Sequence, residues 1–268
     1  MNEDESPLSG GILVVAPHMD DETLGCGMLM TRHATKYAVH VLFATDGARS
    51  PERAGAVAPA SGLAAVRETE AVHALTILGI PQANVEFLRF PDGSLEEHRP
   101  QLGAIVAERV ATLRPSYVLV PFRYDRHRDH LAVNHAVTES VSAGRLNAQL
   151  LEYFVYTQWR LLRSGDVRDY LPAEDLLHVS SPAAAERKRR ALACYRSQTT
   201  RYFDWQRRPI LAETLIDRVC GEPETFLRHR PERNGRRGLA RGRRWVPIAC
   251  RLEPALKSWK DRVRGLAE

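Results

Sequence analysis

The feature that most constrains the fold is an alternation of short apolar runs with helical stretches in the first half of the chain. Strands buried on both faces and joined by helices form βαβ units and a parallel sheet. The runs lie at residues 11–16, 39–44, 85–88 and 117–120, and a fifth follows at about 150–156. Helical patterns lie between them at about 21–37, 63–78, 101–113 and 131–143. The sequence therefore predicts an α/β fold, a Rossmann-like, mostly parallel sheet of order 3-2-1-4-5 flanked by helices.

Composition excludes several other classes of protein. The 268 residues are 44% hydrophobic and 26% charged, which is globular rather than disordered or collagenous. No apolar run approaches the ~20 residues that span a bilayer, and the acidic residues 1–7 precede no hydrophobic region, so we expect no signal peptide. The four cysteines show no C-x-x-C spacing, which argues against a disulfide framework and favours a cytoplasmic location.

The positive charge is concentrated at the C-terminus. Residues 228–268 hold 13 Lys and Arg against 4 Asp and Glu, so we divide the chain into a domain at 1–227 and a basic extension at 228–268. An apolar stripe in this extension has helical spacing: Leu252, Leu256, Trp259, Val263 and Leu266. Such a helix either packs on the body of the protein or lies on an anionic membrane surface, which for a cytoplasmic protein is the inner face of the membrane. The basic run contains no recognisable nucleic-acid-binding motif, so we expect no nucleic-acid partner.

Two polar segments follow the first and fourth apolar runs. Residues 18–22 read His-Met-Asp-Asp-Glu, and residues 125–130 read Asp-Arg-His-Arg-Asp-His. In the order 3-2-1-4-5 these strands are neighbours where the order reverses, which is where such sheets bind ligands. Two imidazoles and a carboxylate form a catalytic zinc site that leaves a position open for water, whose pKa the ion lowers to about 7. A second carboxylate can then act as general base. Taken singly, each segment also suits a plainer interpretation, a solvated turn or a helix N-terminus.

These segments resemble the hallmarks of the PIG-L/LmbE-like family of zinc-dependent N-acetylglucosamine deacetylases, Ala-His-Pro-Asp-Asp-Glu and His-x-Asp-His. Here they read Ala16-Pro17-His18-Met19-Asp20-Asp21-Glu22 and His127-Arg128-Asp129-His130. The resemblance implies that the zinc ligands are His18, Asp21 and His130. It implies that Asp20 is the general base and that His127 stabilises the oxyanion or acts as general acid. Softer matches, which include Lys188 and Arg196-Ser197-Gln198, extend the resemblance over roughly residues 10 to 200.

The same resemblance assigns substrate contacts. It implies that Arg67 and Asp92 contact the substrate sugar; the plainer alternatives are that Asp92 caps a turn and that Arg67 pairs with Glu70. Met19 and Arg128 stand where the family usually has proline, which loosens the ligand loop without removing a ligand. We expect Arg128 to place positive charge at the substrate rim.

Together with the two motifs, the resemblance implies a metal-dependent amide hydrolase. Such an enzyme would remove an acetyl or other acyl group from an N-acylated amino sugar or sugar conjugate, with a lipid-linked sugar as one candidate, through metal-bound hydroxide and an Asp base. The alternative is a non-catalytic protein that binds anions or docks on membranes through its basic C-terminal tail. A dinucleotide-dependent oxidoreductase is disfavoured, because the carboxylates of Asp20, Asp21 and Glu22 would repel a pyrophosphate at the first turn.

Overall fold

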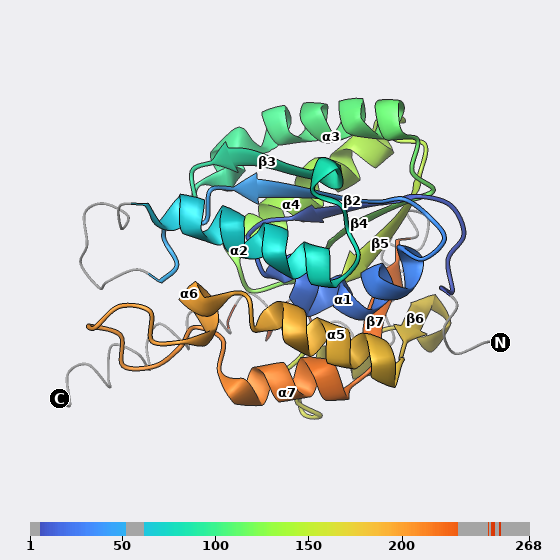
Figure 1. The fold of residues 1–268 in the computed structure, drawn as a ribbon. Helices are drawn as coiled ribbons and strands as arrows, with labels where there is room; N and C mark the ends of the chain where they lie inside the picture. The colour runs from blue at the N-terminus through green and yellow to red at the C-terminus, as the bar shows by residue number, and fades with distance from the viewer. Residues whose placement is uncertain (1–5, 52–61, 230–245, 247, 250–251, 253–268) are drawn as a thin grey trace.

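In the computed structural model, which describes residues 6–51, 62–229, 246, 248–249 and 252, the core is a seven-stranded sheet of order β3-β2-β1-β4-β5-β7-β6 (Figure 1). Its strands are β1 (Ile12–Ala16), β2 (Val39–Thr45), β3 (Val85–Phe90), β4 (Tyr117–Pro121), β5 (Gln149–Tyr153), β6 (Leu176–Val179) and β7 (Glu224–Arg228). The first five are parallel, and β7 runs antiparallel to both β5 and β6. The predicted fold class and the order 3-2-1-4-5 are confirmed, and two strands extend the sheet beyond β5.

Helices cover both faces of the sheet (Figure 1). The α-helices are α1 (Asp21–His33), α2 (Leu63–Ile77), α3 (Arg99–Leu113), α4 (Arg128–Ser142), α5 (Pro182–Leu192), α6 (Arg196–Thr199) and α7 (Glu213–Gly221). Short 3₁₀ helices are η1 (Gln82–Asn84), η2 (Leu95–His98), η3 (Val167–Tyr170) and η4 (Ala173–Asp175). One face carries α3 and α4; the other carries α1 and α2, with α5 and α7 packed outside α1. None of the described helices is both long and apolar enough to cross a bilayer.

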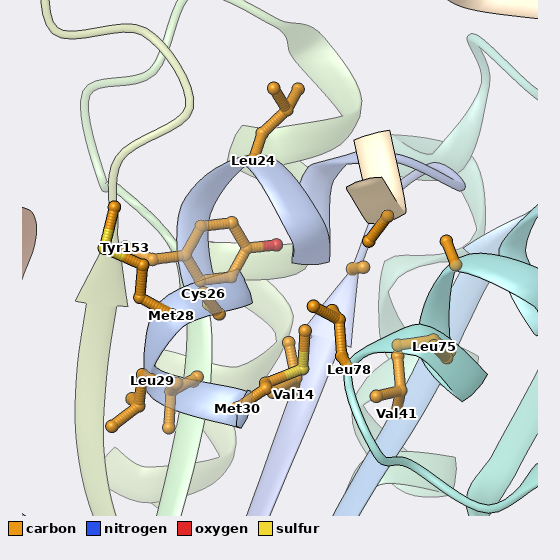
Figure 2. Packing of buried hydrophobic residues seen from close by; sticks show 14 of the residues in the cluster. Val14, Leu24, Cys26, Met28, Leu29, Met30, Val41, Leu75, Leu78 and Tyr153 are labelled. Atoms are coloured by element: carbon orange, nitrogen blue, oxygen red, sulfur yellow. The ribbon is translucent and has the colours of Figure 1, made fainter. Parts of the chain in front are cut away.

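Strand β1 shows why its sequence is an unbroken apolar run. All five residues are buried, and they alternate between two cores. Val14 joins the cluster of α1 and α2, whereas Leu13 and Val15 join the cluster of α3 and α4. Figure 2 shows the first cluster, which brings together residues of β1, α1, β2, α2 and β5.

The structure departs from the expected element boundaries near the polar segments. The helix expected after His130 begins at Arg128, because the His127 side chain caps it by accepting a hydrogen bond from the Asp129 N–H. His130 therefore lies in the first turn of α4. Strand β7 was not predicted, since it begins with a buried glutamate, Glu224, and its sequence Glu-Thr-Phe-Leu-Arg contains only a short apolar run.

The predicted C-terminal extension falls largely outside the described residues. Its stripe residues beyond Leu252 are not described, so the amphipathic helix stays a prediction. Two described residues of the extension, Val246 and Ala249, are buried in a cluster with Phe122 and Phe154. At least this part of the extension packs on the body.

Candidate active site

The sheet brings the two polar segments together. Strands β1 and β4 are adjacent and parallel, with Val14 opposite Leu119, so both carboxyl ends lie at one edge of the sheet. The first segment leaves β1 and enters α1, while the second leaves β4 and enters α4. The rings of His18 and His130, which are 112 residues apart in sequence, have centroids 5.5 Å apart.

The three residues expected to bind zinc form one contact group. Oδ2 of Asp21 lies 3.0 Å from Nδ1 of His18 and 3.2 Å from Nε2 of His130. Around a tetrahedral zinc ion with bonds of about 2.0–2.1 Å, neighbouring ligand atoms are about 3.3 Å apart. The two distances to Asp21 and the chemistry of the donors are compatible with neighbouring ligands of such an ion.

Further donors surround this group. Among the described residues, ligand atoms of His18, His127 and His130 all lie within 4.8 Å of one another, and so do those of His18, Asp92 and Asp129; neither group includes Asp21. Nε2 of His18 is 3.3 Å from Oδ1 of Asp92 and 3.2 Å from Oδ2 of Asp129. Asp92, expected to contact the sugar, thus also contacts a candidate metal ligand.

Asp20 contacts a buried arginine. Its Oδ1 lies 3.3 Å from Nη2 of Arg67, which is almost completely buried and also donates to the carbonyl of Met19 at 2.6 Å. The alternative pairing of Arg67 with Glu70 is not seen: Glu70 instead accepts hydrogen bonds from the backbone N–H and hydroxyl of Ser197. Arg67 therefore stabilises a carboxylate that has no other charged partner of opposite sign within contact distance among the described residues.

Buried charges set the protonation of the metal-binding group. Burial alone would lower the pKa of His130, but the charges of Asp21 and Asp125 outweigh it and raise this pKa to about 10. Burial acts to raise the pKa of Asp21, but the charge and contact of His130, with the contact of His18, hold it well below its ordinary value. An ionised carboxylate between two imidazoles can accept a divalent cation once the imidazole protons are displaced.

The two expected catalytic groups have pKa shifts opposite in direction to those of the metal-binding group: the carboxyl pKa is raised and the imidazole pKa is lowered. Burial raises the pKa of Asp20 to about 7, against the lowering effect of the Arg67 charge. Burial and the positive charges of His18 and His130 lower the pKa of His127 to about 4. At neutral pH, Asp20 is thus poised to exchange a proton, whereas His127 is a neutral imidazole.

These residues line one cavity of about 300 Å³. Its walls are formed by His18, Asp20, Asp21, Leu24, Arg49, Ser50, Arg67, Asp92, Gly93, His127, His130, Tyr156, Gln198, Ile210 and Leu211. Arg128 is exposed beside it and donates to the carbonyl of Gly93 at 3.0 Å. The structure therefore gathers the expected metal, catalytic and sugar-contact residues around one space, with Arg128 at its edge.

Sequence reasoning gave no role to three other residues here. Asp129, buried within the second motif, accepts hydrogen bonds from the N–H groups of Gly93 and Leu95 and so fixes the loop that carries Asp92. Its place inside the motif was the available signal. Arg49 and Tyr156 also line the cavity, and no motif marks them, because they reach it through tertiary folding.

The Rossmann-like fold with a histidine–carboxylate group at the carboxyl edge of its sheet narrows the chain to the α/β proteins that carry a polar site at this edge, and comparison with known proteins identifies the family. The sequence profile described as "PIG-L: GlcNAc-PI de-N-acetylase" matches residues 13–141. "Uncharacterized deacetylase YaiS" of Escherichia coli (strain K12) is 31% identical over 158 residues, which cover 56% of this chain and 76% of that protein. The chain belongs to the PIG-L/LmbE-like deacetylase family.

Solved structures share the fold. A deacetylase of the teicoplanin biosynthesis pathway, in complex with bog, superposes with a TM-score of 0.61 at 19% identity, covering 82% of this chain and 99% of that one. N,N'-diacetylchitobiose deacetylase from Pyrococcus horikoshii gives a TM-score of 0.59 at 18% identity, covering 84% and 86%. At such identities the likeness establishes the architecture.

Proposed function

We propose that this protein is a zinc-dependent amide hydrolase that removes an acetyl or other acyl group from an N-acylated amino sugar or sugar conjugate. The observation that carries the proposal is the Asp21 carboxylate, which lies 3.0 Å from His18 and 3.2 Å from His130 on the wall that also presents Asp20. A site that only bound a metal would not need a second, separately held carboxylate. The family's deacetylases, which include a diacetylchitobiose deacetylase, support an N-acetyl sugar as substrate.

The protein's own groups divide the work of hydrolysis. A divalent ion held by His18, Asp21 and His130 would polarise the acyl carbonyl and the attacking water. Asp20 takes a proton from that water as its oxygen bonds to the carbonyl carbon, and a pKa of about 7 suits this transfer near neutral pH. As the C–N bond breaks, the same proton passes to the leaving nitrogen, which gives a free amine and a carboxylic acid.

His127 suits the role of a hydrogen-bond donor to the developing oxyanion. Its Nδ1 accepts the N–H of Asp129 at 3.3 Å, and its lowered pKa keeps the ring neutral. The remaining proton of a neutral imidazole is then on Nε2, the nitrogen left to face the substrate. A neutral donor stabilises negative oxygen without first needing a proton from solvent.

The remaining contacts concern specificity. We assign Arg67 and Asp92 to sugar hydroxyl groups and Arg128 to the rim. Both Arg67 and Asp92 line the cavity, but Arg67 also holds Asp20, so its loss affects the base as well.

A cytoplasmic enzyme acting on a lipid-linked sugar could use the basic extension to reach the membrane. The four residues of the extension described beyond 245 include exposed Ile248 and Leu252. Flotation of the full chain and of a chain ending at residue 229 with anionic liposomes tests this contact. Equal flotation of the two proteins contradicts it.

The function is tested with metal-loaded protein and a panel of N-acetylglucosamine conjugates, scoring free amine by mass spectrometry. We expect a chelator to abolish turnover and added zinc to restore it. Turnover that survives complete removal of metal contradicts the metal-dependent mechanism.

A further inference from the structure

A segment far from both motifs contacts the elements that hold the active site. We call residues 188–198, which run from the second half of α5 through most of α6, the brace segment. Four of its side chains that carry polar groups are completely buried: those of Lys188, Tyr195, Ser197 and Gln198. Only Gln198 lines the cavity, so the chemistry described above leaves the other three without a role.

The contact of Tyr195 leads to the general base. Its hydroxyl donates to Oε1 of Glu22, which is itself completely buried. The other carboxylate oxygen of Glu22 accepts the backbone N–H of Asp20 at 3.1 Å. A path of two hydrogen bonds therefore joins the brace segment to the backbone of Asp20.

The backbone of Asp20 needs such support. Its φ is 141° and its ψ is −29°, a conformation that residues with a Cβ rarely adopt. Holding a residue in a sparsely populated region of this kind costs about 1–3 kcal/mol, and surrounding contacts must over-determine it. The bond from the Asp20 N–H to Glu22 is such a contact.

The brace segment also contacts the surroundings of Arg67, the ion-pair partner of Asp20. Ser197 donates two hydrogen bonds to Glu70, which lies one turn from Arg67 on α2. Gln198 donates to the carbonyl of Ser50 at 2.7 Å, and Arg67 donates to that same carbonyl at 3.4 Å. The brace segment thus contacts three sites around Asp20: Glu22, helix α2, which carries Arg67, and the Ser50 carbonyl, which lies between β2 and α2 in the sequence.

We propose that Tyr195 is a positioning residue for the reaction: through Glu22 it holds the Asp20 backbone in the conformation that points the base into the cavity. The proposal rests on the proposed function, in which Asp20 is the base. Metal binding and substrate binding use other side chains, so losing the Tyr195 hydroxyl lowers kcat and leaves KM and bound metal unchanged. A merely structural tyrosine would change stability alone.

The test compares Tyr195→Phe with Tyr153→Phe. Tyr153 is a matched control because it is also completely buried, donates its hydroxyl to the carbonyl of Val15 at 3.1 Å and packs against Gly25 of the same helix α1. Each variant loses one buried hydroxyl, so we expect similar decreases in Tm and one equivalent of metal in both. We expect kcat to fall about tenfold in Tyr195→Phe only, the effect of losing one buried hydrogen bond.

Equal kcat values in the two variants overturn the proposal. Glu22→Gln gives a second test that does not depend on folding of Tyr195→Phe, and we expect kcat to fall there too. In the double variant the two losses should not multiply, because both residues act through one contact; a multiplied loss shows independent action and overturns the proposal. A wild-type protein without amidase activity refutes the proposed function instead, so the two failures are distinguishable.

Discussion

Replacing Asp20 by asparagine separates turnover from metal binding and from folding. Asparagine keeps the shape of the side chain and tolerates positive φ better than most residues, whereas alanine would add strain at φ 141°. Removing a general base costs about 10²–10⁴ in rate, or about 3–5 kcal/mol in the activation free energy. The metal donors of His18 and His130 contact Asp21 rather than Asp20, so we expect bound metal to be unchanged.

The same substitution, which lowers turnover, should not lower the stability of the folded protein at pH 7. Burial raises the pKa of Asp20 from 3.8 to about 7, so the folded protein disfavours the ionised form. This pKa difference corresponds to about 4 kcal/mol of stability, present below pH 3.8 and lost as the pH rises to about 7. A neutral amide avoids that loss, and Arg67 keeps its carbonyl acceptors at Met19 and Gly47. The metal-free Asp20→Asn variant should therefore have a Tm at pH 7 equal to or above that of the wild type.

The assays are acetate release, metal content and thermal unfolding of the same preparations. Asp217→Asn is a control for loss of one negative charge, because Asp217 is an exposed residue of α7 paired with Arg189. We expect the control to keep full turnover. An Asp20→Asn variant that is metal-loaded, folded and fully active would falsify the assignment of Asp20 as the base.

Three further predictions follow from buried groups. His130→Ala should lose both bound metal and turnover, and a variant that retains one equivalent of metal contradicts its role as a ligand. Burial would raise the pKa of Glu152, but its hydrogen-bond donors hold this pKa below the ordinary 4.5. The ionised carboxylate therefore contributes stability above pH 4.5 and loses that contribution as the pH falls below it. In urea unfolding, Glu152→Gln should be less stable than the wild type at pH 7 and approach it below pH 4.5, and a difference that is constant with pH contradicts this reasoning. Gly25→Ala should cost about 1–3 kcal/mol in urea unfolding, because the new Cβ would lie 2.3 Å from Cδ2 of Tyr153, while Gly221→Ala, with open space at its Cβ, should cost nothing; equal effects contradict the packing argument.

The parallel half of the fold could be predicted because its signals are local. Strands β1, β2 and β4 are short apolar runs that are buried almost throughout. The edge strand β3 is only partly buried, but its apolar residues lie between two helical patterns and so still mark a strand. Strand β7 lacks such a signal. Its Glu224 is buried by an ion pair with Lys188, a residue 36 positions earlier, and no local pattern reveals that compensation.

The sequence by itself determined which chemical groups are present at the site: two motifs that carry the imidazoles and carboxylates, each next to a strand end. Only the tertiary structure decided what those groups do to one another. It placed Arg67 against Asp20 rather than Glu70, and it brought Tyr195 to Glu22 across 173 residues. The physical reason is range, because strand and helix signals act over a few residues, whereas burial and charge act across any separation that folding closes.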